Sequence, residues 1–216
     1  MAQIFHPAWN PISRVSIFGG LFVAAALLWV SGCLVRSSYV TEAGVMRDQP
    51  IPFSHKHHAG ELGIDCRYCH TSVEESSFAG LPPTKTCMNC HSLIWADSPV
   101  LEPVRDSFAS GQAISWSRVH RLPGYVYFDH SIHLAKGVGC VACHGRVDDM
   151  PLVAQQATLY MEWCLDCHRH PEPAIGPREE VCNPSWSWPG DRQLLGQQLA
   201  RTYHVASRTD CVDCHR

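Results

Sequence analysis

Ten cysteines and five histidines of this chain recur in one short pattern, Cys-x-x-Cys-His. The two thiols of such a pattern can bond covalently to the vinyl groups of one haem, and the adjacent histidine then becomes the proximal ligand of its iron. Zinc sites also use Cys-x-x-Cys pairs, but they do not require a histidine directly after the second cysteine. The sequence therefore predicts five covalently attached c-type haems. Their anchors and proximal ligands are Cys66, Cys69, His70, Cys87, Cys90, His91, Cys140, Cys143, His144, Cys164, Cys167, His168, Cys211, Cys214 and His215.

The composition agrees with a chain organised around cofactors. Twelve cysteines and fourteen histidines among 216 residues are far above ordinary usage, and a disulfide framework would not need the histidines. The 17 basic and 20 acidic residues nearly balance, which argues against nucleic-acid binding. Because no nucleotide loop and no nucleophile–base pair is recognisable, we expect an electron carrier and no catalytic residue. The two remaining cysteines, Cys33 and Cys182, are predicted to be inert thiols.

An uncharged segment of 21 residues, 15–35, lies between Arg14 and Arg36. A helix of that length spans the hydrocarbon core of a bilayer, roughly 30 Å. It exceeds the apolar core of a signal peptide and lacks an obvious cleavage site, so we expect a single uncleaved transmembrane helix. Val30-Ser31-Gly32-Cys33 resembles a lipoprotein cleavage box, so lipidation of Cys33 stays open. Since c-type haem is attached outside the cytoplasm, we expect 1–14 in the cytoplasm and 36–216 on the extracytoplasmic face of the cytoplasmic membrane.

The chain contains an internal duplication. The pattern Phe-x-His-x-x-His starts at Phe53 and again at Phe128, each time ahead of a haem motif that is followed by a second one. The two repeats span about 53–91 and 128–168, and the fifth motif lies on a Pro-containing C-terminal arm, 169–216.

Two histidines three residues apart share one face of a helical turn, so each repeat can serve two neighbouring haems. We expect His55 to bind the first iron and His130 the third, while His58 and His133 reach adjacent irons. The fifth distal ligand stays open between His120, His204, Met150 and Met161, since methionine is also an accepted axial ligand.

The predicted fold class is mainly α with much irregular coil, a multihaem cytochrome with class III-like repeats behind one transmembrane helix. Polar caps, proline and glycine predict a helix over 97–111, and apolar periodicity predicts another over 191–203.

Three stretches of the chain resemble the pentahaem subunit of bacterial alternative complex III, a quinol:electron-acceptor oxidoreductase. They are the Phe-Ser-His-x-x-His run before Cys66-Arg67-Tyr68-Cys69-His70, the run Val119-His120-Arg121-Leu122-Pro123, and Met161-Glu162-Trp163-Cys164. The resemblance implies an electron relay subunit with polytopic quinol-oxidising partners and an iron–sulfur-type peripheral subunit. It further implies a monohaem cytochrome, copper protein or terminal oxidase as acceptor, and it favours His120 as the fifth distal ligand.

A single-helix quinol dehydrogenase that feeds a periplasmic reductase is the alternative. Such proteins place the first haem motif close behind the membrane helix. Here about 30 residues separate Val35 from Cys66, which disfavours this alternative.

Overall fold

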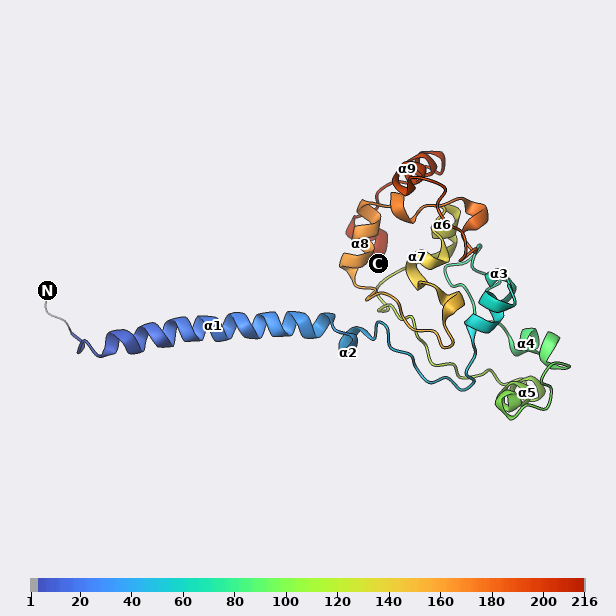
Figure 1. The fold of residues 1–216 in the computed structure, drawn as a ribbon, viewed down its shortest axis with the longest axis horizontal. Coiled ribbons are helices and arrows are strands. Elements are labelled where there is room, and N and C mark those ends of the chain that lie inside the picture. Colours follow the sequence, from blue (N-terminus) through green and yellow to red (C-terminus); the bar gives the residue numbers. More distant parts are fainter. Residues whose placement is uncertain (1–3, 216) are drawn as a thin grey trace. The chain divides into compact units, whose positions relative to one another are not determined.

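The computed structural model describes residues 4–215. The chain forms two compact units, Met1–Ala43 and Gly44–Arg216 (Figure 1).

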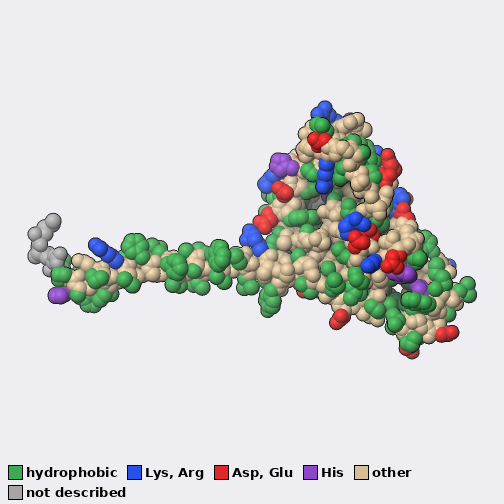
Figure 2. Space-filling view, in the orientation of Figure 1, with side chains coloured by type: hydrophobic (Ala, Val, Ile, Leu, Met, Phe, Trp, Pro, Cys, Tyr) green, Lys and Arg blue, Asp and Glu red, His purple; other side chains and the backbone are tan. Residues whose placement is uncertain are grey.

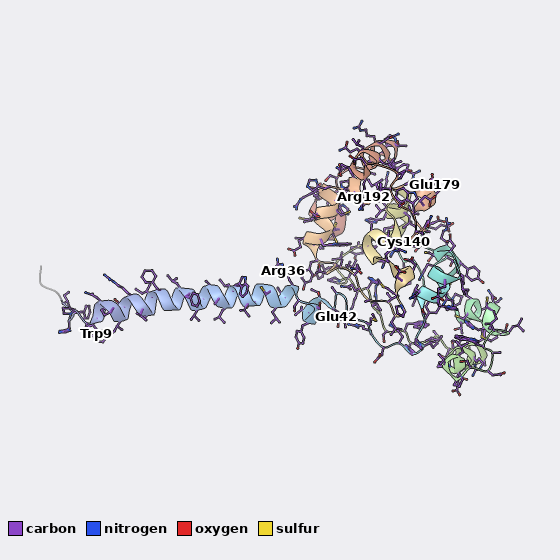
Figure 3. All side chains as sticks on the ribbon, viewed as in Figure 1. Trp9, Arg36, Glu42, Cys140, Glu179 and Arg192 are labelled. Atoms are coloured by element: carbon purple, nitrogen blue, oxygen red, sulfur yellow. The ribbon has the colours of Figure 1, made fainter. Side chains whose placement is uncertain are left out.

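The first unit consists of one long helix, α1 (Trp9–Arg36), followed by the short α2 (Ser38–Thr41). In the part of the chain that the structure describes, α1 alone is long and apolar enough to cross a membrane. Its 28 residues correspond to a length of about 42 Å. Hydrophobic side chains cover it along its length (Figure 2), and Figure 3 marks its two ends. The predicted segment 15–35 lies entirely within this helix.

The second unit is built from short helices joined by long irregular segments (Figure 1). Within residues 4–215 the chain forms no β-strand, and its β-structure is limited to isolated bridges, so the predicted mainly helical, coil-rich fold is confirmed. The helices of this unit are η1 (Lys56–Glu61), α3 (Cys66–Cys69), α4 (Thr84–His91), η2 (Pro99–Leu101), α5 (Glu102–Ser110), α6 (His130–Ala135), α7 (Cys140–His144), η3 (Val147–Asp149), α8 (Met161–Arg169), η4 (Glu172–Ala174), η5 (Arg178–Glu180), α9 (Arg192–Thr202) and α10 (Cys211–Cys214).

Both helices expected from the sequence are present. The segment 97–111 forms η2 and then α5, which ends at Gly111 with a left-handed φ of 73°. Before α9, the Asp191 carboxylate accepts hydrogen bonds from two backbone N–H groups of the first turn, at 2.8 and 3.2 Å. Such a cap satisfies donors that have no partner inside the helix.

Two small clusters of buried side chains lie in the core of the second unit, and cysteines of the Cys-x-x-Cys-His motifs pack against each of them. The packing therefore fixes these motifs relative to the surrounding helices. The first cluster contains Val73, Leu134, Val181 and Cys182, with Cys66, Ala79 and Cys140 against it. The second contains Ile51, Leu101 and Val104, with Cys87, Met88, Ile114 and Trp116 against it.

The two repeats differ by one residue, and the backbone shows where it is accommodated. Thirteen positions separate Phe53 from Cys66, whereas twelve separate Phe128 from Cys140. The first repeat forms a π-helix, η1, where the second forms the α-helix α6. A π-turn takes one more residue per turn than an α-turn, so it absorbs the extra residue without changing the contacts at either end.

Candidate haem sites

Each of the five Cys-x-x-Cys-His motifs lies on a short helix. Two cysteines three residues apart share one face of a helical turn, so both thiols can reach one ligand. We number the sites in chain order by their first cysteine and histidine: site 1 (Cys66, His70), site 2 (Cys87, His91), site 3 (Cys140, His144), site 4 (Cys164, His168) and site 5 (Cys211, His215).

A second histidine ring lies near the proximal histidine of each of the first four sites. Two imidazoles that bind one iron, each through a bond of about 2 Å, have ring centres roughly 6 Å apart. The four observed separations match this spacing. The ring centres are 6.5 Å apart for His55 and His70, 6.2 Å for His58 and His91, 6.3 Å for His130 and His144, and 6.1 Å for His133 and His168.

A phenylalanine contacts both predicted distal histidines of each repeat. The ring of Phe53 meets His55 edge-on at 4.9 Å and stacks on His58 at 4.4 Å. One aromatic side chain thus holds two imidazoles that belong to different sites. The second repeat has the same geometry: Phe128 lies 4.7 Å from His130, edge-on, and 4.5 Å from His133, stacked.

Hydrogen bonds at Nδ1 fix the orientation of most of these rings. A backbone carbonyl can only accept, so Nδ1 carries the proton and Nε2 keeps the lone pair that a metal needs. The bonds run from His58 to Ser54 (2.8 Å), His70 to Gly80 (2.7 Å), His91 to Ile94 (2.9 Å), His130 to Ser77 (2.8 Å), His133 to Asp129 (2.6 Å) and His215 to Tyr125 (3.2 Å).

Burial keeps two of the paired rings neutral, which is the form that binds metals. Burial, followed by the neighbouring His70 and His58, lowers the pKa of His55 to about 4. Burial, followed by His120 and His130, lowers the pKa of His144 to about 3. Within residues 4–215, the buried Nδ1 of His55 has no hydrogen-bond partner. Spacing, tautomers and charge state together fit haem iron between the paired rings.

The structure places His120 beside site 3. Its ring centre lies 4.3 Å from that of His144, and its Nε2 is 3.2 Å from Nδ1 of His144. At site 5, the aromatic ring recorded against His215 is that of Tyr125, at 5.7 Å. His204 and Met161 are exposed and Met150 is half-buried. The identity of the fifth distal ligand therefore stays a prediction.

Cys182 has a position that sequence reasoning missed. Cys33 is exposed on α1, but Cys182 is buried between the first cysteines of sites 1 and 3. Hydrogen bonds with Cys182 and Cys66, together with burial, raise the pKa of the Cys140 thiol. No local signal could reveal this contact, because Cys182 lies 116 residues from Cys66 in the chain.

Comparison with known proteins supports the same chemistry. Residues 126–216 match the family of cytochrome c7 and related cytochrome c, a stretch that includes sites 3, 4 and 5. Over this stretch the chain is similar to multihaem cytochromes c. The chain is also similar to the menaquinone reductase, multiheme cytochrome c subunit, of Nitratidesulfovibrio vulgaris, with 38% identity over 99 residues. That match covers 45% of this chain and 46% of the relative, so the chain spans about half the length of the relative it matches.

Proposed function

We propose that this chain carries five c-type haems and serves as the electron-transfer subunit of a quinone-linked oxidoreductase in a membrane. The observation that carries the proposal is the set of four histidine pairs with ring centres 6.1–6.5 Å apart. Two histidines bind one iron at each of the first four sites, and His215 is the proximal ligand of the fifth.

An iron held by two protein ligands has no coordination position left for a substrate, and its chemistry is the transfer of single electrons. The residues of the chain then have three tasks. The cysteines attach the cofactors, the histidines bind the metal, and the carbonyls that accept from Nδ1 hold the imidazoles in place. None of these residues acts as an acid, base or nucleophile, so quinone chemistry belongs to partner subunits.

The helix α1 supports a membrane location. It is exposed along its length and carries no charge between Arg14 and Arg36. We assign it as a single transmembrane helix with the haem unit on the extracytoplasmic face, where c-type haem is attached.

The resemblance to the pentahaem subunit of alternative complex III supports a defined direction of transfer. Electrons from quinol, oxidised in polytopic partner subunits next to an iron–sulfur-type subunit, pass through this chain. They leave to a monohaem cytochrome, a copper protein or a terminal oxidase.

A second candidate has the opposite direction. The relative from Nitratidesulfovibrio vulgaris is a subunit of a menaquinone reductase, and this favours electron flow through the haems towards a quinone. Both candidates share the relay role and differ in which end of the chain receives electrons.

Purification of the full-length chain from membranes in mild detergent tests the role. We expect polytopic subunits to co-purify, five haems per chain by pyridine haemochrome analysis, and reduction of the haems by menadiol in the complex but not in the separated chain. Haem reduction in the separated chain would identify a self-sufficient quinol dehydrogenase instead. Rapid oxidation of dithionite-reduced haems by menadione, with slow reduction by menadiol, would favour the menaquinone-reducing direction.

A further inference from the structure

We propose that the five haem sites form one row in the order 2, 1, 3, 4, 5, in which only consecutive members are in contact and sites 2 and 5 are the ends. The inference deepens the proposed function, and it rests on the part of it that puts a haem at each site. The order differs from the order of the motifs in the sequence.

Sites 1 and 2 are neighbours through a shared turn and a side-chain bond. His55 of site 1 and His58 of site 2 lie on one turn against the ring of Phe53. Between the two motifs, the amide of Asn89 donates to the hydroxyl of Tyr68 at 3.0 Å. Haems bound at the two sites are therefore held side by side.

Sites 1 and 3 meet at their first cysteines, which pack against the same buried cluster. Figure 3 labels one of them, Cys140, near the middle of the second unit in that view. Cys66 and Cys140 both pack against Cys182, which is only 7% exposed. The sulfur of Cys66 lies 3.6 Å from the carbonyl oxygen of Cys182, and the backbone N–H of Cys140 donates to the carbonyl of Val181 at 2.9 Å. Because each of these cysteines carries one edge of a haem, the two haem edges meet at the same place.

Site 2 packs elsewhere. Its Cys87 and Met88 lie against the second core cluster, with Ile51, Leu101 and Val104, whereas Cys140 of site 3 lies in the first. Site 1 therefore stands between site 2 and site 3, although site 2 precedes site 3 in the sequence.

Site 4 joins site 3 in the way that site 2 joins site 1. His130 and His133 lie on one turn against Phe128 and belong to sites 3 and 4. Site 5 follows site 4, because the hydroxyl of Ser207, on the segment that leads to α10, donates to the carbonyl of His168 at 2.9 Å.

Low-temperature EPR of the oxidised full-length chain in detergent tests the order, because magnetic broadening between two haems falls steeply with distance. Signals are assigned with His55→Met and His58→Met, which alter sites 1 and 2 separately. Removal of site 3 by Cys140→Ala/Cys143→Ala is expected to narrow the signals of sites 1 and 4 and leave site 2 unchanged. If the EPR signal of site 2 narrows and that of site 1 is unchanged, the proposed order is wrong, and the haems follow the order of their motifs in the sequence.

If the variant without site 3 cannot be produced, a second variant tests the order. Cys87→Ala/Cys90→Ala removes site 2, at one end of the row, so only the EPR signal of site 1 is expected to narrow. If the signal of site 3 narrows as well, the order is wrong.

The order and the proposed function fail separately in these experiments. If the coupling pattern follows the row but menadiol does not reduce the haems of the complex and menadione does not oxidise them, the relay function is wrong and the order stands. If menadiol reduces the haems and the coupling pattern is that of the sequence order, the order is wrong and the relay stands.

Discussion

The contact between His120 and His144 leads to a prediction about the potential of one haem. Burial, followed by the charge of His130, lowers the pKa of His120, so its ring is neutral and one of its nitrogens can accept a hydrogen bond. With Nε2 of His144 on the iron, Nδ1 carries the proton and donates to Nε2 of His120 across 3.2 Å. This bond makes the ligand more electron-donating and so stabilises the oxidised iron more than the reduced one.

The size of the effect follows from hydrogen-bond energetics. A bond between neutral groups contributes about 1 kcal/mol net and one to a charged group about 1.5–3 kcal/mol, so oxidation strengthens this bond by about 1 kcal/mol. For a one-electron couple this corresponds to roughly 40 mV. We therefore expect His120→Phe to raise the potential of site 3 by roughly 40 mV while all low-spin signals are retained.

Spectroelectrochemical titration combined with EPR of the full-length chain measures this shift. His120→Gln, which keeps an acceptor, is expected to restore most of the original potential. His57→Phe is the matched control, because His57 is exposed and pairs with Glu61 at 2.8 Å. Loss of the low-spin signal of site 5 in His120→Phe would refute the reasoning and identify His120 as the fifth axial ligand, as would be expected from the Val119-to-Pro123 segment.

Four further substitutions, one of them a control, test how the surroundings support site 1 and the stability of the fold. Gly80→Ala forces a side chain onto a residue with φ +82° whose carbonyl holds a site 1 ligand, so we expect a loss of about 1–2 kcal/mol and altered site 1 EPR. Gly190→Ala is the control, because Gly190 has a φ of +87° and lies in open space; it should lose similar stability and leave the EPR signal of site 1 unchanged. If both variants change the site 1 signal equally, the carbonyl of Gly80 does not hold the site 1 ligand. The Arg146 guanidinium, 2.6 Å away, holds the pKa of Asp148 below its usual range, so this pair stabilises the fold above about pH 4 and loses its effect as the pH falls. Asp148→Asn should therefore lower Tm at pH 7, and the difference in Tm from the unchanged chain should shrink on acidification. A difference in Tm that does not depend on pH would show that the ion pair is not its cause. Asp191→Ala removes the cap of α9 and should cost about 1 kcal/mol in thermal unfolding, whereas an unchanged Tm would show that the cap contributes nothing.

The local parts of this molecule could be predicted from the sequence. The haem motifs, the membrane-length helix and the capped helices depend on residues a few positions apart, and their spacing is visible along the chain. The duplication also led to expectations for His55, His58, His130 and His133, because two similar segments each preceded a pair of motifs.

The remaining features depend on contacts between distant segments. The position of Cys182 against Cys66, and that of His120 against His144, arise when coil segments fold over the helices. Coil has no periodicity from which such contacts could be inferred. The π-turn of η1 depends on a one-residue difference between the repeats, which changes the backbone and leaves the motif spacing almost intact.

The meeting of Cys66 and Cys140 also bears on direction. These cysteines occupy equivalent positions in the two repeats, and contact between equivalent positions is the mark of a two-fold relation, as in a symmetric dimer. In the proposed row, the first four sites are then arranged symmetrically, because sites 2 and 4 are equivalent and so are sites 1 and 3. A symmetric row of four haems does not by itself favour electron transfer in either direction. The C-terminal arm with Cys211, Cys214 and His215 breaks this symmetry, and it makes one end of the molecule chemically different from the other.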